Sequence, residues 1–154
     1  MIRVLFVCYG NICRSPMAEF IFKDMIEKKG ISDEFIVASA ATSSEEIYNG
    51  VGNPVYPPAR EELRRHGISC EGKRAMQLCR ADYERYDHII GMEDVNIRYM
   101  LKILGGDPDN KLSKLLDYTD RGGNISDPWY TGDFVTTYND ILEGLEGFLE
   151  YLGY

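Results

Sequence analysis

The N-terminal 30 residues predict a strand, a short loop and a helix in immediate succession. Residues 2–7 (IRVLFV) form an apolar run of strand length, which is typical of a strand buried in a parallel sheet. Residues 16–29 predict a helix that ends at Gly30. The apolar residues on one face of this helix are Ala18, Ile21, Phe22 and Met25. Only residues 8–15 separate the two elements, so the helix begins beside the carboxyl end of the strand.

Apolar strands and amphipathic helices continue to alternate along the chain. The pattern predicts strands at 35–40 and 88–92, a weaker strand at 114–118, helices at 59–66, 94–104 and 134–152, and long loops at 42–58 and 119–133. Such alternation implies a parallel sheet with right-handed crossovers. We therefore expect an α/β fold with a single domain over residues 1–154. Its four-stranded parallel sheet would carry helices on both faces, in a doubly wound, flavodoxin-like arrangement whose ligands bind beyond the carboxyl ends of the strands.

Length and composition limit the classes of protein to which this chain can belong. At 154 residues it can bury a core without disulfides or metals. No segment approaches the ~20 apolar residues of a membrane span, and the N-terminal apolar run is too short for a signal peptide. The net charge of −8 argues against non-specific binding to nucleic acid or to an anionic membrane. The four cysteines do not suggest a secreted disulfide framework, so we expect a cytoplasmic monomer with no nucleic-acid or membrane partner.

The loop after the first strand combines the groups that stabilise a thiolate. Cys8 is followed after five residues by Arg14, and Ser15 and Pro16 are the expected N-cap and first residue of the helix. A thiolate is stabilised by a helix N-terminus, by converging backbone N–H groups and by a nearby cation. The loop amides can surround a tetrahedral anion while the Arg14 guanidinium binds two of its oxygens. We predict that the loop binds an oxyanion and aims the Cys8 sulfur at its centre; its other residues are Tyr9, Gly10, Asn11, Ile12, Cys13 and Ser15.

A structural cysteine and a zinc site are the two alternatives to a catalytic loop. Cys8 could simply close a core strand, with Arg14 on the surface, but the ordered succession of strand, cysteine, arginine and helix favours catalysis. A zinc site is a poor fit. Cys8 and Cys13 could form a ligand pair, but Cys70 and Cys79 are separated by eight residues and lack the usual short spacing. We expect neither a metal nor a cofactor.

Asp127 is the candidate for a general acid. Transfer of a phosphoryl group to Cys8 leaves an alkoxide or phenoxide that must be protonated. Asp127 precedes Pro128, which favours an extended backbone, and it lies in a loop that follows a predicted strand and carries Trp129 and Tyr130. An ordinary Asp-Pro turn is the alternative, and the presence of the Cys8 loop favours the catalytic interpretation.

Four segments resemble the low-molecular-weight protein tyrosine phosphatases. They are CYGNICRSP at 8–16, SAATS at 39–43, HGI at 66–68 and DPWY at 127–130, and the resemblance extends over nearly the whole chain. It implies an enzyme that hydrolyses phosphotyrosine in proteins through a phosphocysteine intermediate. Its partner would be a tyrosine-phosphorylated protein substrate.

The resemblance also implies a role for each matching residue. Cys8 would be the nucleophile, Arg14 would bind the phosphate oxygens, and Asp127 would protonate the leaving group and then deprotonate the attacking water. The supporting residues would be Ser15, which donates to the Cys8 sulfur, and Asn11, Ser39 and His66, which hold the loop in shape. The walls of the slot for an aromatic ring would be Tyr9, Trp129 and Tyr130.

Cys13 is suggested by the same resemblance as a resolving thiol. A low-pKa thiolate is the group that peroxide oxidises first, and a neighbouring thiol can intercept its sulfenic acid as a disulfide. This implies a redox-sensitive enzyme. The alternative is that Cys13 packs under the loop as a small apolar residue.

Two regions depart from the family pattern. The segment Tyr56-Pro57-Pro58 stands where the family often has Asp-Pro-Arg, and residues 48–52 read as a small insertion. Trp129 also stands where many members have the first of two tyrosines. We expect these departures to change the rim of the cleft and not its floor.

Three other functions remain as alternatives. Thiol-dependent arsenate reduction needs two further cysteines, for which Cys70 and Cys79 are available. Phosphoarginine hydrolysis occurs in relatives with Thr at the position of Ile12, and the bulkier apolar Ile12 favours a flat ring over a guanidinium. A non-catalytic phosphotyrosine-binding module would use the loop without turnover.

Overall fold

The computed structural model describes residues 1–154 and is built around a four-stranded sheet. Its strands are β1 (Ile2–Cys8), β2 (Phe35–Ala41), β5 (His88–Gly91) and β6 (Leu112–Lys114). They lie in the order β2-β1-β5-β6, and every neighbouring pair is parallel. Cys8 pairs with Ala41 and Val7 pairs with Gly91. The carboxyl ends of three strands therefore meet beside Cys8.

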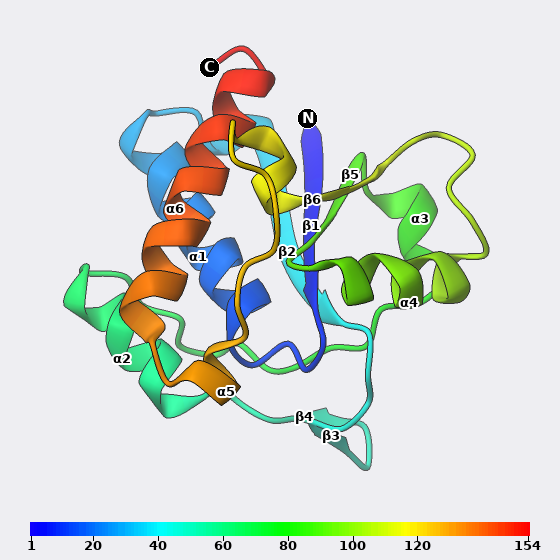
Figure 1. The fold of residues 1–154 in the computed structure, drawn as a ribbon, viewed down its shortest axis with the longest axis horizontal. Helices are drawn as coiled ribbons and strands as arrows, with labels where there is room; N and C mark the ends of the chain where they lie inside the picture. Colours follow the sequence, from blue (N-terminus) through cyan, green and yellow to red (C-terminus); the bar gives the residue numbers. More distant parts are fainter.

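Helices cover both faces of the sheet (Figure 1). One face carries α1 (Arg14–Lys28), α2 (Pro57–Arg65) and α6 (Phe134–Tyr151), and the other carries α3 (Asp82–Arg85) and α4 (Asp94–Leu104). Strand β1 supplies side chains alternately to two cores: Val4 and Phe6 to the larger and Leu5 and Val7 to the smaller. Both faces of β1 are buried from Val4 onward, which explains the apolar run at 4–7. The doubly wound α/β prediction is confirmed.

The chain around residue 115 differs from the prediction of a strand at 114–118. Strand β6 ends at Lys114, and a 3-10 turn, η2 (Leu115–Tyr118), follows it. The Asp117 carboxylate accepts a hydrogen bond of 2.9 Å from the Lys114 N–H, which closes the turn. Leu115 and Leu116 are both fully buried. In a strand, consecutive side chains point to opposite faces, so the turn is what lets both enter the core under α6.

The segment predicted as a loop at 42–58 contains a short hairpin of β3 (Ile47–Tyr48) and β4 (Val51–Gly52). Asn49 and Gly50 connect the two strands, and their φ values are 51° and 77°. An Asn-Gly pair with positive φ at both positions favours a tight two-residue hairpin turn. The expected insertion at 48–52 thus corresponds to most of this hairpin.

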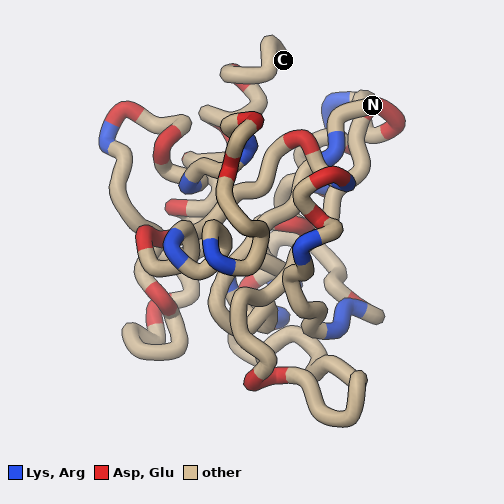
Figure 2. The backbone as a smooth tube through the Cα atoms, turned by 90° about the vertical axis from the view of Figure 1, so that its right-hand side faces the viewer, with Lys and Arg blue, Asp and Glu red and all other residues tan.

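The remaining short elements are η1 (Ser32–Glu34) and α5 (Pro128–Thr131). In Figure 1, α5 and the β3–β4 hairpin lie at the end of the molecule where β1 turns into α1, and both chain termini lie at the opposite end. Figure 2 shows acidic and basic residues interspersed over the chain. None of the helices has the length and apolar character needed to cross a bilayer.

Candidate active site

The loop between β1 and α1 turns back on the Cys8 sulfur. The backbone N–H of Asn11 donates to Cys8 Sγ at 3.3 Å, and Ser15 Oγ lies 2.9 Å from the same atom. Asn11 has a φ of 58°, a left-handed conformation that few non-glycine residues adopt. Cys8, Asn11 and Ser15 are all buried. The sulfur is therefore held by two donors that can stabilise its negative charge.

The role of Ser15 at the helix start differs from the prediction. Helix α1 begins at Arg14 with Cys13 at the N-cap position, and no side chain caps it. The Ser15 hydroxyl is turned inward to Cys8 and to the amide of Asn11, which donates to it at 2.7 Å. A hydroxyl buried among these partners cannot also reach the free amides of the first turn, so the N-cap prediction is wrong.

Asn11 links the loop to the second strand. Its Nδ2 donates to Ser15 Oγ and, at 2.9 Å, to Ser39 Oγ in β2. Its Oδ1 accepts from the Met76 N–H at 3.0 Å, which fixes the orientation of the amide. The structure brings Asn11, Ser15 and Ser39 together beneath the Cys8 sulfur.

His66 lies elsewhere, at the C-terminal end of α2. Its Nε2 lies 3.0 Å from a Glu62 carboxylate oxygen, and its ring stacks on Tyr138 of α6 with centroids 3.7 Å apart. These contacts join α2 to α6. The structure therefore does not bring His66 to the phosphate-binding loop as the sequence motif had led us to expect.

Arg14 is the cation of the site, and its side chain is only 3% exposed. Nη1 donates to the Ile125 carbonyl at 3.0 Å and to the Glu93 carboxylate, and Nη2 lies 3.3 Å from Asp127 Oδ2. Burial opposes the positive charge, but Cys8, Asp127 and Glu93 outweigh it and raise the pKa of Arg14. The guanidinium is therefore a permanent positive charge beside the sulfur.

Glu93 is a site residue that the sequence analysis missed. It follows β5 almost directly, and the side-chain oxygen of Asn96 accepts hydrogen bonds of 3.0 Å from both the Met92 and Glu93 N–H groups. Its position near the carboxyl end of a predicted strand was the one available signal, because such positions face ligands in parallel sheets.

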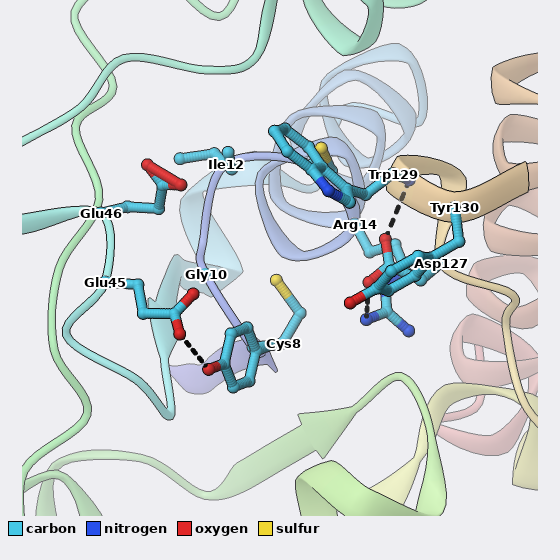
Figure 3. A pocket seen from close by; sticks show the side chains of 11 residues that line it. Cys8, Gly10, Ile12, Arg14, Glu45, Glu46, Asp127, Trp129 and Tyr130 are labelled. Atoms are coloured by element: carbon cyan, nitrogen blue, oxygen red, sulfur yellow. Dashed lines mark hydrogen bonds and ion pairs between the residues drawn. The ribbon is translucent and has the colours of Figure 1, made fainter. Parts of the chain in front are cut away.

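Asp127 reaches the site from the start of α5. Its Oδ1 accepts from the Trp129 N–H at 3.0 Å, so it caps α5, and its Oδ2 is directed at Arg14. Figure 3 shows the carboxylate of Asp127 beside the Arg14 guanidinium, on one side of the Cys8 sulfur. The Asp-Pro turn and the contact with Arg14 thus occur together.

These residues surround a cavity of about 150 Å³. Its lining consists of Cys8, Tyr9, Gly10, Ile12, Cys13, Arg14, Glu45, Glu46, Asp127, Trp129 and Tyr130. The aromatic side chains of Tyr9, Trp129 and Tyr130 are 41%, 54% and 85% exposed, so they stand at the mouth, whereas Cys8 lies buried at the floor. A ligand with a compact anionic head and a flat apolar stem fits such a site.

Comparison with known protein families identifies this chain. The sequence model described as "Low molecular weight phosphotyrosine protein phosphatase" matches residues 3–153. The chain belongs to the low-molecular-weight protein tyrosine phosphatase family. It is therefore a hydrolase, as the sequence motifs had predicted.

Individual phosphatases of this family are similar over their whole length. The low molecular weight protein-tyrosine-phosphatase YfkJ of Bacillus subtilis is 40% identical over 151 residues, which cover 97% of this chain and 94% of the relative. Its crystal structure superposes with a TM-score of 0.92, covering 99% of this chain and 94% of that one. An arginine phosphatase from Drosophila is 30% identical, with a TM-score of 0.84 and 98% of each chain covered.

The rim of this phosphatase combines the two regions that depart from the family pattern. The ring centroids of Tyr56 and Trp129 lie 4.8 Å apart, so these two residues, one from each departing region, contact each other. On another side of the cavity, Tyr9 donates a 2.6 Å hydrogen bond to Glu45, which raises the pKa of Tyr9. Glu46 accepts from Asn53 at 2.8 Å. Glu45 and Glu46 both line the cavity, and neither was predicted from the sequence as a site residue.

The other cysteines of this phosphatase occupy different environments. Cys13 is buried and lines the cavity, and burial strongly raises the pKa of its thiol. Cys70 is buried in the larger core, where burial raises its pKa as well, and Cys79 is exposed. Of the four free cysteines, only Cys8 and Cys13 line the cavity. No group of three or more His, Cys, Asp or Glu residues is arranged to hold a metal ion.

Proposed function

We propose that this phosphatase hydrolyses phosphotyrosine in proteins through a phosphocysteine intermediate on Cys8. The observation that carries the proposal is the position of the Cys8 sulfur. It lies at the floor of an aromatic-walled cavity, it faces two donors, and Arg14 and Asp127 stand beside it. A nucleophile, an anion-binding cation and a proton donor thus converge on one point.

Substrate binding begins with the phosphate group. A phosphate dianion enters the loop and accepts hydrogen bonds from the amides at the start of α1, which have no intrahelical partner. It also competes with Asp127 and Glu93 for the Arg14 guanidinium, whose planar fork suits two phosphate oxygens. Binding therefore frees the Asp127 carboxylate from Arg14, and after taking up a proton from solvent this group can approach the leaving oxygen.

The first chemical step transfers the phosphoryl group to the enzyme. Cys8 Sγ forms a bond to phosphorus while the bond from phosphorus to the tyrosine oxygen breaks, and the proton of the Asp127 carboxyl group passes to that oxygen. Tyrosine leaves as a neutral phenol. Arg14 and the loop amides bind the charge that develops on the three other phosphate oxygens.

The second step releases phosphate. A water oxygen bonds to phosphorus as Asp127 takes a proton from that water, and the sulfur–phosphorus bond breaks. Cys8 leaves as the thiolate, which the Ser15 hydroxyl and the Asn11 N–H stabilise. This step leaves Cys8 as the thiolate and Asp127 protonated, so the next phosphotyrosine can react.

The walls of the cavity support an aryl substrate. Tyr9, Trp129 and Tyr130 offer flat surfaces, and aromatic pairs contribute roughly 0.5–1.5 kcal/mol beyond their buried area. Ile12 adds an apolar group to the lining. A phosphotyrosine stem can stack between such groups.

Phosphoarginine is the second candidate substrate, and the two rim carboxylates favour it. Glu45 and Glu46 line the same cavity, and a carboxylate attracts a guanidinium. The similar structure from Drosophila is that of an arginine phosphatase. Arsenate reduction has less support, because neither Cys70 nor Cys79 lines the cavity.

The test is a panel of phosphotyrosine peptide, alkyl phosphate, phosphoarginine and arsenate, assayed with excess chelator. The wild type should hydrolyse the phosphotyrosine peptide fastest, and Cys8→Ser should be inactive but still bind phosphate, because the loop amides and Arg14 are unchanged. Cys79→Ser is the matched control and should keep full activity. Faster hydrolysis of phosphoarginine would identify phosphoarginine, and not phosphotyrosine, as the preferred substrate. Turnover by folded Cys8→Ser, or a requirement for added metal, would refute the mechanism.

The expected cytoplasmic location, the monomeric state, the single domain and the redox sensitivity accompany this proposal as predictions. Cys13 supports the last of these, since it lines the cavity that contains Cys8.

A further inference from the structure

A continuous chain of hydrogen bonds runs from the Cys8 sulfur into the interior. Ser15 Oγ lies 2.9 Å from Cys8 Sγ, Asn11 Nδ2 lies 2.7 Å from Ser15 Oγ and 2.9 Å from Ser39 Oγ, and Ser39 Oγ donates to Glu19 Oε1 at 2.6 Å. All five residues are buried. The chain joins β1, the loop, α1 and β2, and it ends at a carboxylate in the core.

The direction of the protons along this chain follows from the number of donors at each residue. The Asn11 amide orientation is fixed, because its oxygen accepts from the Met76 N–H. Its two N–H groups therefore point to the two serine oxygens. Each serine has one proton, and Ser39 gives its proton to Glu19. The Ser15 proton then has two acceptors within reach, the Cys8 sulfur at 2.9 Å and the Ala40 carbonyl at 3.5 Å, and the sulfur makes the shorter contact.

This direction depends on the ionised state of Glu19. A carboxylate is an acceptor only, whereas a protonated carboxyl group can donate to Ser39 and reverse the chain. Glu19 has a side-chain exposure of 6%, and a buried carboxylate without a cation tends to become neutral. A cation beside Glu19 is therefore needed to keep the chain oriented.

Two lysines contact Glu19, and they differ in burial. Lys23, on the next turn of α1, bonds Oε2 at 2.6 Å and is 43% exposed. Lys73 lies 3.6 Å from Oε1, donates to the Ser39 carbonyl at 3.0 Å and is 9% exposed. Water screens the first pair far more than the second. Lys73 is thus the cation beside the oxygen that Ser39 bonds.

We propose that Lys73 is a positioning residue for the nucleophile: by keeping Glu19 ionised, it directs the Ser15 proton onto the Cys8 sulfur. The inference rests on the proposed role of Cys8. Lys73 contacts neither substrate nor sulfur and acts through Glu19, Ser39, Asn11 and Ser15.

The charged surroundings of Lys73 agree with this role. Burial lowers the pKa of Lys73 from its usual value of 10.5, and Glu19 opposes that change. The other charged groups that affect it are Lys23 and Cys8. The segment that carries Lys73 is fixed to the end of β2, because the Met76 carbonyl accepts from the Ala41 N–H at 2.7 Å.

The test measures thiolate formation at Cys8 without substrate, as the pH profile of its alkylation by iodoacetamide, with mass-spectrometric fragmentation to separate Cys8 from Cys13. Lys73→Met should slow alkylation at neutral pH about tenfold and move its profile to higher pH, since a hydrogen bond to a charged group is lost. Glu19→Gln should do the same, because its amide can donate to Ser39. Lys73→Arg should restore the wild-type profile. Lys23→Met is the matched control, and its profile should remain that of the wild type.

Turnover provides a second readout. Lys73→Met should lower kcat about tenfold while KM changes little, because the phosphate-binding groups are retained. An unchanged alkylation profile in folded Lys73→Met, or an equal shift in Lys23→Met, would overturn the proposal. If Lys73→Met does not fold, Lys73→Gln serves in the same comparison. Because alkylation needs no turnover, its profile tests Lys73 even if the proposed substrate is wrong.

Discussion

Among single residues, Arg14 is held by two carboxylates that differ in their other contacts. Asp127 accepts a hydrogen bond from the Trp129 N–H and stands at the cavity wall, whereas Glu93 lies just after β5 and bonds the other guanidinium nitrogen. Both pair with the cation, but only Asp127 lines the cavity. Their replacement should therefore affect catalysis in different ways.

Asp127→Asn should slow poor leaving groups far more than good ones. General acid catalysis contributes about 10²–10⁴-fold when the leaving group needs the proton, so the loss should shrink for an activated aryl phosphate. Glu93→Gln is the comparison variant: it loosens Arg14 and should reduce kcat/KM by a similar factor for all leaving groups. The rates of a series of aryl phosphates with different leaving-group pKa values measure both. Equal losses across the series for Asp127→Asn would assign it a structural role.

Cys13→Ser should be active but should lose its protection against peroxide. In the wild type the buried Cys13 thiol can form a disulfide with an oxidised Cys8, and a thiol reductant should restore activity. Without Cys13, the Cys8 sulfenic acid should proceed to the irreversible sulfinic form. Activity after peroxide and then reductant measures this, with Cys79→Ser as the control. Peptide mapping that pairs Cys8 with Cys70 would contradict the assignment.

Some of the candidate site residues were accessible from the sequence and others were not. Cys8, Asn11, Arg14 and Ser15 lie within one short loop, so local spacing was enough to group them. Glu93 and Lys73 join the site only through the packing of distant segments. His66 was misplaced because a three-residue motif does not specify where the end of a helix packs.

At the scale of elements, the two glycines of α6 allow the helix to approach η2. A Cβ at Gly147 would lie 2.1 Å from the Tyr118 carbonyl oxygen, and one at Gly144 would lie 2.6 Å from Leu115 Cγ. From the sequence alone, a glycine within a helix predicts a less stable helix. Here it is required by close packing, which residue propensities do not describe.

Gly147→Ala should therefore destabilise the protein although alanine favours helices. The gain in helix propensity is about 1 kcal/mol, whereas overpacking against a fixed backbone typically costs about 1–3 kcal/mol. We expect a net decrease in the free energy of unfolding, measured by urea denaturation. Glu146→Ala, at the exposed neighbouring position, is the control and should change little. A more stable Gly147→Ala protein would show that α6 can move away from η2.

Helices and strands were predicted correctly where the apolar pattern extends over many residues. The prediction failed where individual side chains determine a local turn. Helix α4 was predicted at its observed bounds, 94–104, because a regular pattern precedes Gly105, whose φ is 80°. The end of β6 depends on the Asp117 carboxylate and on the burial of Leu115 and Leu116 on one side of the sheet. Apolar periodicity over five residues cannot distinguish that arrangement from a strand.

At the scale of the whole molecule, His88 makes stability sensitive to mild acid. It begins β5 and packs against Phe148 of α6 with ring centroids 5.3 Å apart, and burial lowers its pKa below 6.5. The unfolded chain binds this proton more readily than the folded chain, so the free energy of unfolding falls as pH drops below about 6.5. Carboxylates such as Asp87, whose hydrogen bond from Arg3 lowers its pKa below 3.8, act only in stronger acid.

His88→Phe should remove this sensitivity while keeping a ring against Phe148. The difference in unfolding free energy between pH 7.5 and pH 5.5 should be smaller for His88→Phe than for the wild type, as measured by urea denaturation. Between pH 7.5 and pH 8.5, where His88 is neutral in both states, the two proteins should behave alike. An equal loss of stability in both proteins at pH 5.5 would assign the acid sensitivity to other groups.

The order of the strands has a consequence for biosynthesis. Strand β1, which ends at the nucleophile, is synthesised before β5, yet it must pair with β5, and Arg14 must meet Glu93 and Asp127. A nascent chain that has not reached residue 127 therefore contains Cys8 and Arg14 but lacks Asp127, the proposed general acid. Because domains generally fold as units, such a chain also lacks the complete core, to which α6 contributes, that orients them. Newly made polypeptide should thus acquire phosphatase activity only after Asp127 and α6 have been synthesised.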